Sequence, residues 1–97
     1  MTVLLVTYPT AAGTRFDTDY YRTTHVPLVV EKWSPYGLVE AKALFPVGDN
    51  PVYHAVAMLT FRDATALAAA IGSPEAADVF GDVPKFTDIA PVAQHLQ

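Results

Sequence analysis

The sequence contains no cysteine, and this absence removes several kinds of chemistry at once. A chain without cysteine has no disulfide bond, no thiolate ligand for a metal ion and no cysteine nucleophile. Serine is also rare, and the two serines, Ser34 and Ser73, are better explained as a turn residue and a helix cap. There is no Gly-x-Ser-x-Gly motif and no glycine-rich loop between a strand and a helix, so neither a serine nucleophile nor a nucleotide site is indicated.

Positive charge is sparse and scattered. The chain carries 6 Lys and Arg against 10 Asp and Glu, which gives a net charge of −4. Nucleic-acid binding depends on basic side chains that neutralise phosphates, so we expect no nucleic-acid partner. No apolar run approaches the length of a membrane span, and the N-terminus lacks the basic region and cleavage site of a signal peptide. We therefore expect a soluble, cytoplasmic protein without a membrane partner.

Apolar residues, by contrast, are abundant for so short a chain. Hydrophobic residues make up 52% of the 97 residues and charged residues 16%. This length allows one domain, residues 1–97. Because small domains bury a smaller fraction of their surface, the apolar excess indicates that a second subunit covers part of the molecule.

Hydrophobic alternation and turn residues predict the order strand, helix, strand, strand, helix, strand. The expected strands are 2–8, 38–47, 52–61 and 89–96, and the expected helices are 17–33, 64–71 and 74–81. This order is the α+β, ferredoxin-like βαββαβ pattern, an antiparallel four-stranded sheet with helices on one face. The uncovered face would carry His54, Val56 and Met58. Apolar patches of this size mark interfaces or ligand grooves, so we expect two sheets to pack face to face in a homodimer.

The helix expected at 17–33 holds the densest group of chemically useful side chains. Asp17 is placed to cap its N-terminus, and Pro27 is expected to kink or break it just after His25. Tyr21 and His25 are four residues apart, so their side chains can meet. On a helical wheel one arc collects five side chains: Tyr20, Tyr21, Thr24, His25 and Leu28.

Acid–base chemistry is the reaction class that these residues allow. A histidine titrates near neutral pH, and a neighbouring tyrosine can donate a hydrogen bond to a developing oxyanion. We therefore predict His25 and Tyr21 as catalytic residues and expect a small apolar or aromatic ligand. Either a satisfied packing role or catalysis is open for His25. The ligand-binding candidates are Tyr20, Thr24, Leu28, His54, Met58 and Phe86.

Other polar groups give weaker signals. His54 is either a second functional histidine or an interface residue, with Glu40 or Lys42 on the neighbouring strand as its expected partner. Asp82 lies with Lys85 and Phe86 in a loop over 82–88, which is either a pocket lid or, the interpretation we favour, a solvated loop. The three histidines lie on three different elements, so we expect no metal site and no cofactor.

A resemblance to a known family extends over nearly the whole chain, including Val6–Pro9 and Tyr53–Phe61, and two segments carry most of it. The stretch Phe16-Asp-x-Asp-Tyr-Tyr-x-x-x-His-x-Pro-Leu28 resembles the signature of the EthD-like family, named for ethyl tert-butyl ether degradation, in the dimeric α/β-barrel superfamily. Gly81-Asp-x-Pro-x-Phe-Thr-Asp-Ile-x-Pro-Val92 is similar to it as well. The resemblance implies one EthD-like dimeric α/β-barrel domain over 1–97, in which Tyr20, Tyr21 and His25 are motif positions.

The resemblance leaves the activity open between two classes. Related barrels include isomerases, cyclases and cofactor-free oxygenases, and others bind haem. One hypothesis is a small catabolic or biosynthetic enzyme that uses acid–base chemistry, as an isomerase, cyclase, decarboxylase or cofactor-free oxygenase, in a pocket near His25. The alternative is a non-catalytic accessory or ligand-binding protein that serves an oxygenase system. A haem site on one of the histidines is a third hypothesis.

Overall fold

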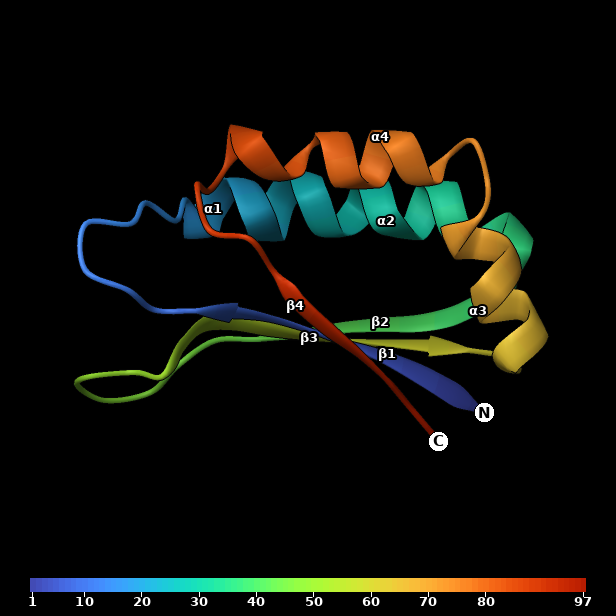
Figure 1. Cartoon of the computed structure of the whole chain (residues 1–97), viewed down its shortest axis with the longest axis horizontal. Coiled ribbons are helices and arrows are strands. Elements are labelled where there is room, and N and C mark those ends of the chain that lie inside the picture. The colour runs from blue at the N-terminus through green and yellow to red at the C-terminus, as the bar shows by residue number, and fades with distance from the viewer.

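A four-stranded antiparallel sheet forms one layer of the protein. The long first helix and the last helix lie over one face of it, and a short helix lies at one end (Figure 1). The computed structural model describes all 97 residues. The strands follow the spatial order β2-β3-β1-β4. Their bounds are β1 Thr2–Pro9, β2 Leu38–Leu44, β3 Tyr53–Phe61 and β4 Val92–Leu96. The predicted α+β, ferredoxin-like architecture is confirmed, although the last strand begins only after Pro91, because proline cannot donate to the strand ladder.

The first helix of the helical layer is continuous through Pro27. Its three segments are α1 Thr18–Tyr20, a π-helical segment Tyr21–His25 and α2 Val26–Trp33. Asp17 caps its start as predicted, since its side chain accepts a hydrogen bond from the Tyr20 amide. Of the kink or break expected after His25, the break does not occur. The Val26 amide bonds to the Tyr21 carbonyl, five residues back, and this wider turn accommodates the proline in the first turn of α2.

Two shorter helices complete the layer. Asp63 caps α3 (Ala64–Ile71), since its carboxylate accepts a hydrogen bond from the Ala66 amide at 2.7 Å. After a turn at Ser73, α4 (Ala76–Gly81) runs beside α2 (Figure 1). A 3₁₀ turn, Val83–Lys85, follows and leads the chain back to β4.

Between the helices and the sheet lies the hydrophobic core, in two groups. One surrounds Trp33, Phe61 and Leu67, near α3. The other contains Tyr8 and Phe86, near the start of the first helix. Burial of large side chains of this kind stabilises a fold by about 1.5–3 kcal/mol each. The core therefore fixes the position of the first helix over β1 and β3.

The other face of the sheet carries apolar side chains that no helix covers. Met58 is 37% exposed, and Val92 on the edge strand is 57% exposed. The strand register adds the following side chains to this face: Val3, Leu5, Leu44, Val56 and Leu96. None of the helices is long and apolar enough to span a membrane.

Candidate functional site

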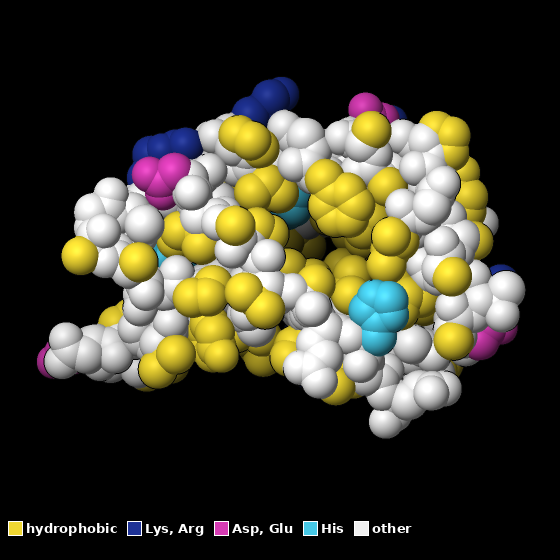
Figure 2. Space-filling model, viewed as in Figure 1, with side chains coloured by type: hydrophobic (Ala, Val, Ile, Leu, Met, Phe, Trp, Pro, Cys, Tyr) yellow, Lys and Arg dark blue, Asp and Glu magenta, His cyan; other side chains and the backbone are white.

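An apolar cavity of about 370 Å³ lies between the first helix, α4 and the sheet. Fourteen of its 17 lining residues are hydrophobic, and none is Asp, Glu, Lys or Arg. Figure 2 shows an opening between the helical layer and the sheet, with hydrophobic side chains around it and histidine beside it. The size and the lining are those of a site for one small ligand.

His25 brings a titratable group to this cavity, and Asp82 holds it in place. The His25 Nδ1 atom lies 2.9 Å from Oδ2 of Asp82, and the two residues are only 5% and 6% exposed. The other carboxylate oxygen, Oδ1, accepts a hydrogen bond of 2.8 Å from the Tyr20 hydroxyl. The carboxylate therefore selects the tautomer with a proton on Nδ1 and leaves Nε2 as an unpaired acceptor.

The pKa values of the pair fit this arrangement. Burial lowers the pKa of His25 below its ordinary value of 6.5, and this effect outweighs the opposing influence of Asp82. Burial acts to raise the pKa of Asp82, but hydrogen bonds from His25 and Tyr20 stabilise the carboxylate and bring its pKa below 3.8. At neutral pH the histidine is therefore neutral and the aspartate ionised, as a general base with an orienting carboxylate requires.

These shifts predict that acidification destabilises the protein in two steps. The unfolded chain takes up a proton at His25 near pH 6.5, before the folded protein does, so unfolding becomes easier as the pH falls below that value. Asp82 adds a second loss of stability below about pH 4, where its unfolded form is protonated first. Urea unfolding between pH 8 and pH 3 measures both steps. His25→Gln should remove the first step, and its persistence in that variant would assign the step elsewhere.

Two tyrosines, Tyr8 and Tyr21, line the cavity together with His25 and a second histidine, His95. Tyr21 and His25 stack with ring centroids 5.6 Å apart, and Tyr8 meets Tyr21 edge-on at 5.4 Å. Burial raises the pKa of Tyr21 to about 12 and also raises that of Tyr8. Both hydroxyl groups therefore stay protonated at neutral pH and can donate hydrogen bonds.

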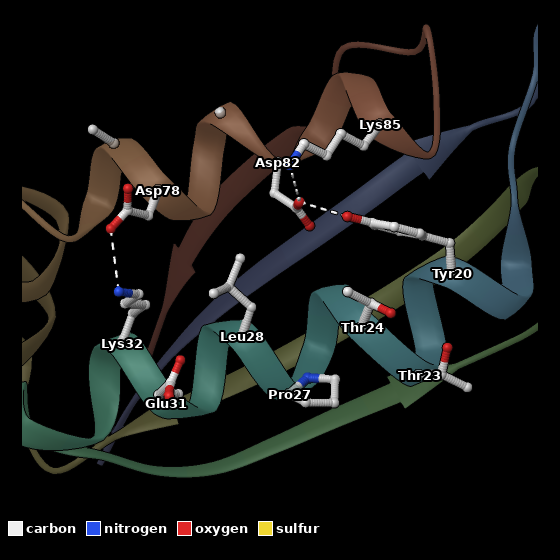
Figure 3. Close-up of a pocket in the computed structure, with 12 residues that line it drawn as sticks. Tyr20, Thr23, Thr24, Pro27, Leu28, Glu31, Lys32, Asp78, Asp82 and Lys85 are labelled. Carbon is white, nitrogen blue, oxygen red and sulfur yellow. Dashed lines mark hydrogen bonds and ion pairs between the residues drawn. The ribbon is translucent and has the colours of Figure 1, made fainter.

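The predicted arc on the first helix is divided between two sides. Tyr21 and His25 face the cavity, whereas Tyr20, Thr24 and Leu28 line an outer groove of about 870 Å³ between this helix and α4. Figure 3 shows the Tyr20 hydroxyl reaching Asp82 across this groove. These three residues thus lie behind the His25–Asp82 pair and not in the cavity.

Three further ligand-binding candidates lie elsewhere. His54 stacks on Phe16 with ring centroids 5.3 Å apart near the start of β3. The strand register places its expected partners Glu40 and Lys42 opposite other residues of β3. Met58 lies on the uncovered face of the sheet. Phe86 is fully buried, with its ring centroid 4.6 Å from that of His25. It therefore supports the histidine from behind and does not line the cavity.

The sequence analysis missed Asp82 as a functional residue. The solvated loop favoured for 82–88 is wrong at this position, because Asp82, Phe86 and Thr87 are all buried. Phe86 anchors the segment, and the Phe86 carbonyl accepts a hydrogen bond from the Asp17 amide at 2.7 Å. The one available signal was the presence of Asp82 and Phe86 in the segment that resembles the family. This signal did not indicate that Asp82 contacts His25.

Tyr8 was missed as well. Its place at the end of an apolar strand predicts only a core residue. No set of three or more His, Asp or Glu side chains is arranged to hold a metal ion.

Comparisons with known proteins agree with the fold. Residues 13–90 match the EthD domain family. An EthD-like protein from Ralstonia eutropha JMP134 is 28% identical, with a TM-score of 0.87 over 99% of this chain and 89% of the other. An ethyl tert-butyl ether degradation (EthD) family protein from Bacillus halodurans C-125 is 20% identical, with a TM-score of 0.68 over 97% and 98%.

A third solved structure gives the same fold at lower identity. A dimeric ferredoxin-like protein of unknown function from Jannaschia sp. CCS1 is 19% identical, with a TM-score of 0.66 over 99% of this chain and 97% of the other. No curated protein matches the sequence. These comparisons establish a family and a fold and leave the reaction to the residues of the cavity.

Proposed function

This chain belongs to the EthD domain family, and from that premise we propose that it is a small enzyme that moves a proton on an uncharged apolar or aromatic ligand. One observation carries the proposal. The Nδ1 atom of His25 is held by the buried Asp82 carboxylate at 2.9 Å, while the ring lines an apolar cavity. A histidine oriented in this way is suited to act as a general base through Nε2.

The geometry supports proton transfer at a carbon atom beside a carbonyl group. His25 Nε2 accepts the proton, and the electron pair of the broken C–H bond moves onto the carbonyl oxygen to give an enolate. The Tyr21 hydroxyl donates a hydrogen bond to that oxygen, and the Asp82 carboxylate stabilises the imidazolium that forms. Return of the proton from Nε2 to the same carbon regenerates the ketone. With a β,γ-unsaturated ketone the enolate is conjugated, and return of the proton to the γ-carbon shifts the double bond and gives isomerisation.

The lining of the cavity restricts the substrate. A charged ligand would lose its hydration without gaining a charged partner, because no Asp, Glu, Lys or Arg lines the space. An uncharged, mostly apolar molecule gains free energy on entering, at about 25 cal/mol per Å² of apolar surface that leaves water. The volume of about 370 Å³ limits the ligand to small molecules.

Ligand binding without turnover is the competing function. The same apolar lining suits an accessory protein that delivers or stores a hydrophobic compound for an oxygenase system. The His25–Asp82 pair favours the enzyme, because a binding site for an apolar compound has no need of a buried base with an orienting carboxylate.

Solvent exchange separates these two functions. The protein is incubated in D₂O with acetophenone and related aryl ketones, and NMR follows the loss of the α-proton signal. Free imidazole at the same concentration and the buffer alone serve as controls. We expect exchange faster than in both controls, with a rate that rises as His25 loses its proton below neutral pH. Saturable binding of these ketones without exchange would instead support the accessory protein.

The uncovered face of the sheet supports a homodimer. Apolar side chains from all four strands lie on it, and a structure with the same fold is described as dimeric. Packing two such faces together would bury the apolar patch and close a barrel.

Charge on this face is predicted to separate the two subunits. The double substitution Val56→Lys and Met58→Lys places two ammonium groups in the centre of the expected interface, where desolvation and mutual repulsion oppose association. Light scattering coupled to size-exclusion chromatography should show a dimer for the wild type and a monomer for the variant at micromolar concentration. Ala69→Lys, on the exposed side of α3, is the matched control and should remain dimeric. A monomeric wild type would contradict the prediction.

A further inference from the structure

Tyr8 and Tyr21 both line the cavity, and neither hydroxyl group makes a hydrogen bond within the protein. The two residues are 2% and 1% exposed, and both line the cavity beside His25. Buried tyrosines usually find a hydrogen-bond partner for their hydroxyl group. The Tyr20 and Tyr36 hydroxyls have such partners, in Asp82 at 2.8 Å and Glu75 at 2.7 Å, but no side-chain hydrogen bond involves Tyr8 or Tyr21.

The free hydroxyl groups of Tyr8 and Tyr21 are not fully enclosed by the protein. The side-chain atoms that are fully enclosed and lack a partner are Thr2 Oγ1 and Trp33 Nε1. The oxygens of Tyr8 and Tyr21 are not among them, so each retains contact with open space. Because both side chains are almost entirely buried and both line the cavity, we infer that this space is the cavity.

Packing explains why aromatic rings occupy these two positions. It does not explain why the residues are tyrosines, with a hydroxyl group, and not phenylalanines. The aromatic contacts of Tyr8 with Phe16, Phe86 and Tyr21, at centroid distances of 5.3, 5.7 and 5.4 Å, would be equally available to phenylalanine. A hydroxyl group that leaves water and gains no partner is costly. Two such hydroxyl groups in a cavity whose other polar lining residues are His25 and His95 indicate an acceptor that is supplied from outside the chain.

We propose that Tyr8 and Tyr21 together bind the carbonyl oxygen of an uncharged aryl ketone-like ligand, with Tyr8 as the second donor. Each O–H group donates one hydrogen bond, and a carbonyl oxygen has two lone pairs to receive them. This inference rests on the proposed function, because it supplies the oxygen-binding half of a site whose base is His25. It also defines the ligand, which has one oxygen atom at the tyrosine end and an apolar body in the rest of the cavity.

The pKa values of the tyrosines agree with a neutral donor pair. Burial raises the pKa of Tyr8, and the nearby Tyr21 adds to this effect. Neither hydroxyl group therefore ionises at neutral pH. A carboxylate ligand would find donors here but no cation, so the site favours a ketone over an acid of the same shape.

Two probes of nearly equal shape test the proposal by binding alone. Acetophenone has a carbonyl group where ethylbenzene has a methylene group, and benzoate replaces the ketone with a charge. The indole N–H of the single tryptophan, Trp33, which lines the cavity, reports binding in ¹⁵N–¹H NMR titrations. The proteins compared are the wild type, Tyr8→Phe, Tyr21→Phe and the double variant, with circular dichroism to verify their folds.

We expect each single variant to bind acetophenone about three- to tenfold more weakly, as the loss of one neutral hydrogen bond implies. The double variant should lose about the product of the two factors. Ethylbenzene should bind every variant at least as tightly as the wild type, because it accepts no hydrogen bond, and benzoate should not bind. The proposal is overturned if acetophenone fails to bind the wild type, or if the variants bind both neutral probes with unchanged or equally weakened affinity.

The result of this binding experiment is independent of whether the proposed enzymatic function is correct. If acetophenone binds through Tyr8 and Tyr21 but its α-protons do not exchange, the oxygen site stands and the enzyme does not. If exchange occurs while the phenylalanine variants bind acetophenone as the wild type does, the enzyme stands and the oxygen site does not.

Discussion

Replacement of His25 by Gln is expected to lower the rate of α-proton exchange by about 10²–10⁴-fold. Glutamine has no basic nitrogen, so it cannot accept the proton, although its amide can still donate to the Asp82 carboxylate. The measurement is the exchange of ketone α-protons in D₂O with equal concentrations of folded wild type and variant. Acetophenone binding, followed at the Trp33 indole, should change far less than the exchange rate.

Two further variants test whether the loss of exchange in His25→Gln is due to the loss of the basic nitrogen. Thr24→Ala alters the neighbouring residue in the outer groove and should exchange at the wild-type rate. Asp82→Asn keeps an oxygen acceptor for His25 Nδ1 but removes the charge that raises the pKa of His25. As a positioning residue, Asp82 should therefore move the pH profile of exchange toward lower pH as well as reduce the rate. If the His25→Gln variant exchanged the α-protons at the wild-type rate, His25 would not be the general base.

Phe86→Ala is expected to reduce the free energy of unfolding by about 3–5 kcal/mol. The Phe86 ring is fully buried, and its centroid lies 4.6 Å from that of His25 and 5.2 Å from that of Tyr21. Its removal leaves a cavity in the group of rings that holds the first helix over β1. Urea unfolding at pH 8, where His25 is neutral in both folded and unfolded states, gives the free energy without the protonation effect.

Phe80→Ala is the control for this substitution. The side chain is 51% exposed and lines the cavity next to Val83, so its loss should cost less than about 1 kcal/mol while ligand affinity falls. A comparable destabilisation by the two substitutions would contradict the buried, supporting role of Phe86. A folded Phe86→Ala protein with unchanged stability would show that the ring does not hold the first helix in place.

Local sequence rules were sufficient for the elements and their order. Asp17 and Asp63 precede helices and cap them in the structure, because a cap depends on residues only three positions away. Alternating apolar residues placed β3 and its two faces correctly. The break expected at Pro27 did not occur, because a π-helical turn, a backbone adjustment that residue types do not reveal, accommodates the ring.

The sequence by itself determined the ferredoxin-like order of elements, the family and the histidine at the centre of the candidate site. Only the tertiary structure showed which residue holds that histidine and which cavity it lines. Asp82 lies 57 positions from His25, and the two meet because α4 packs beside α2 and the buried Phe86 draws the following turn inward. Periodicity and capping report contacts within one or two helical turns, whereas a buried carboxylate–imidazole pair depends on how two distant segments pack. The residues of the first helix therefore indicate the family, and Asp82, directly after α4, is the hydrogen-bond partner of His25 in that helix.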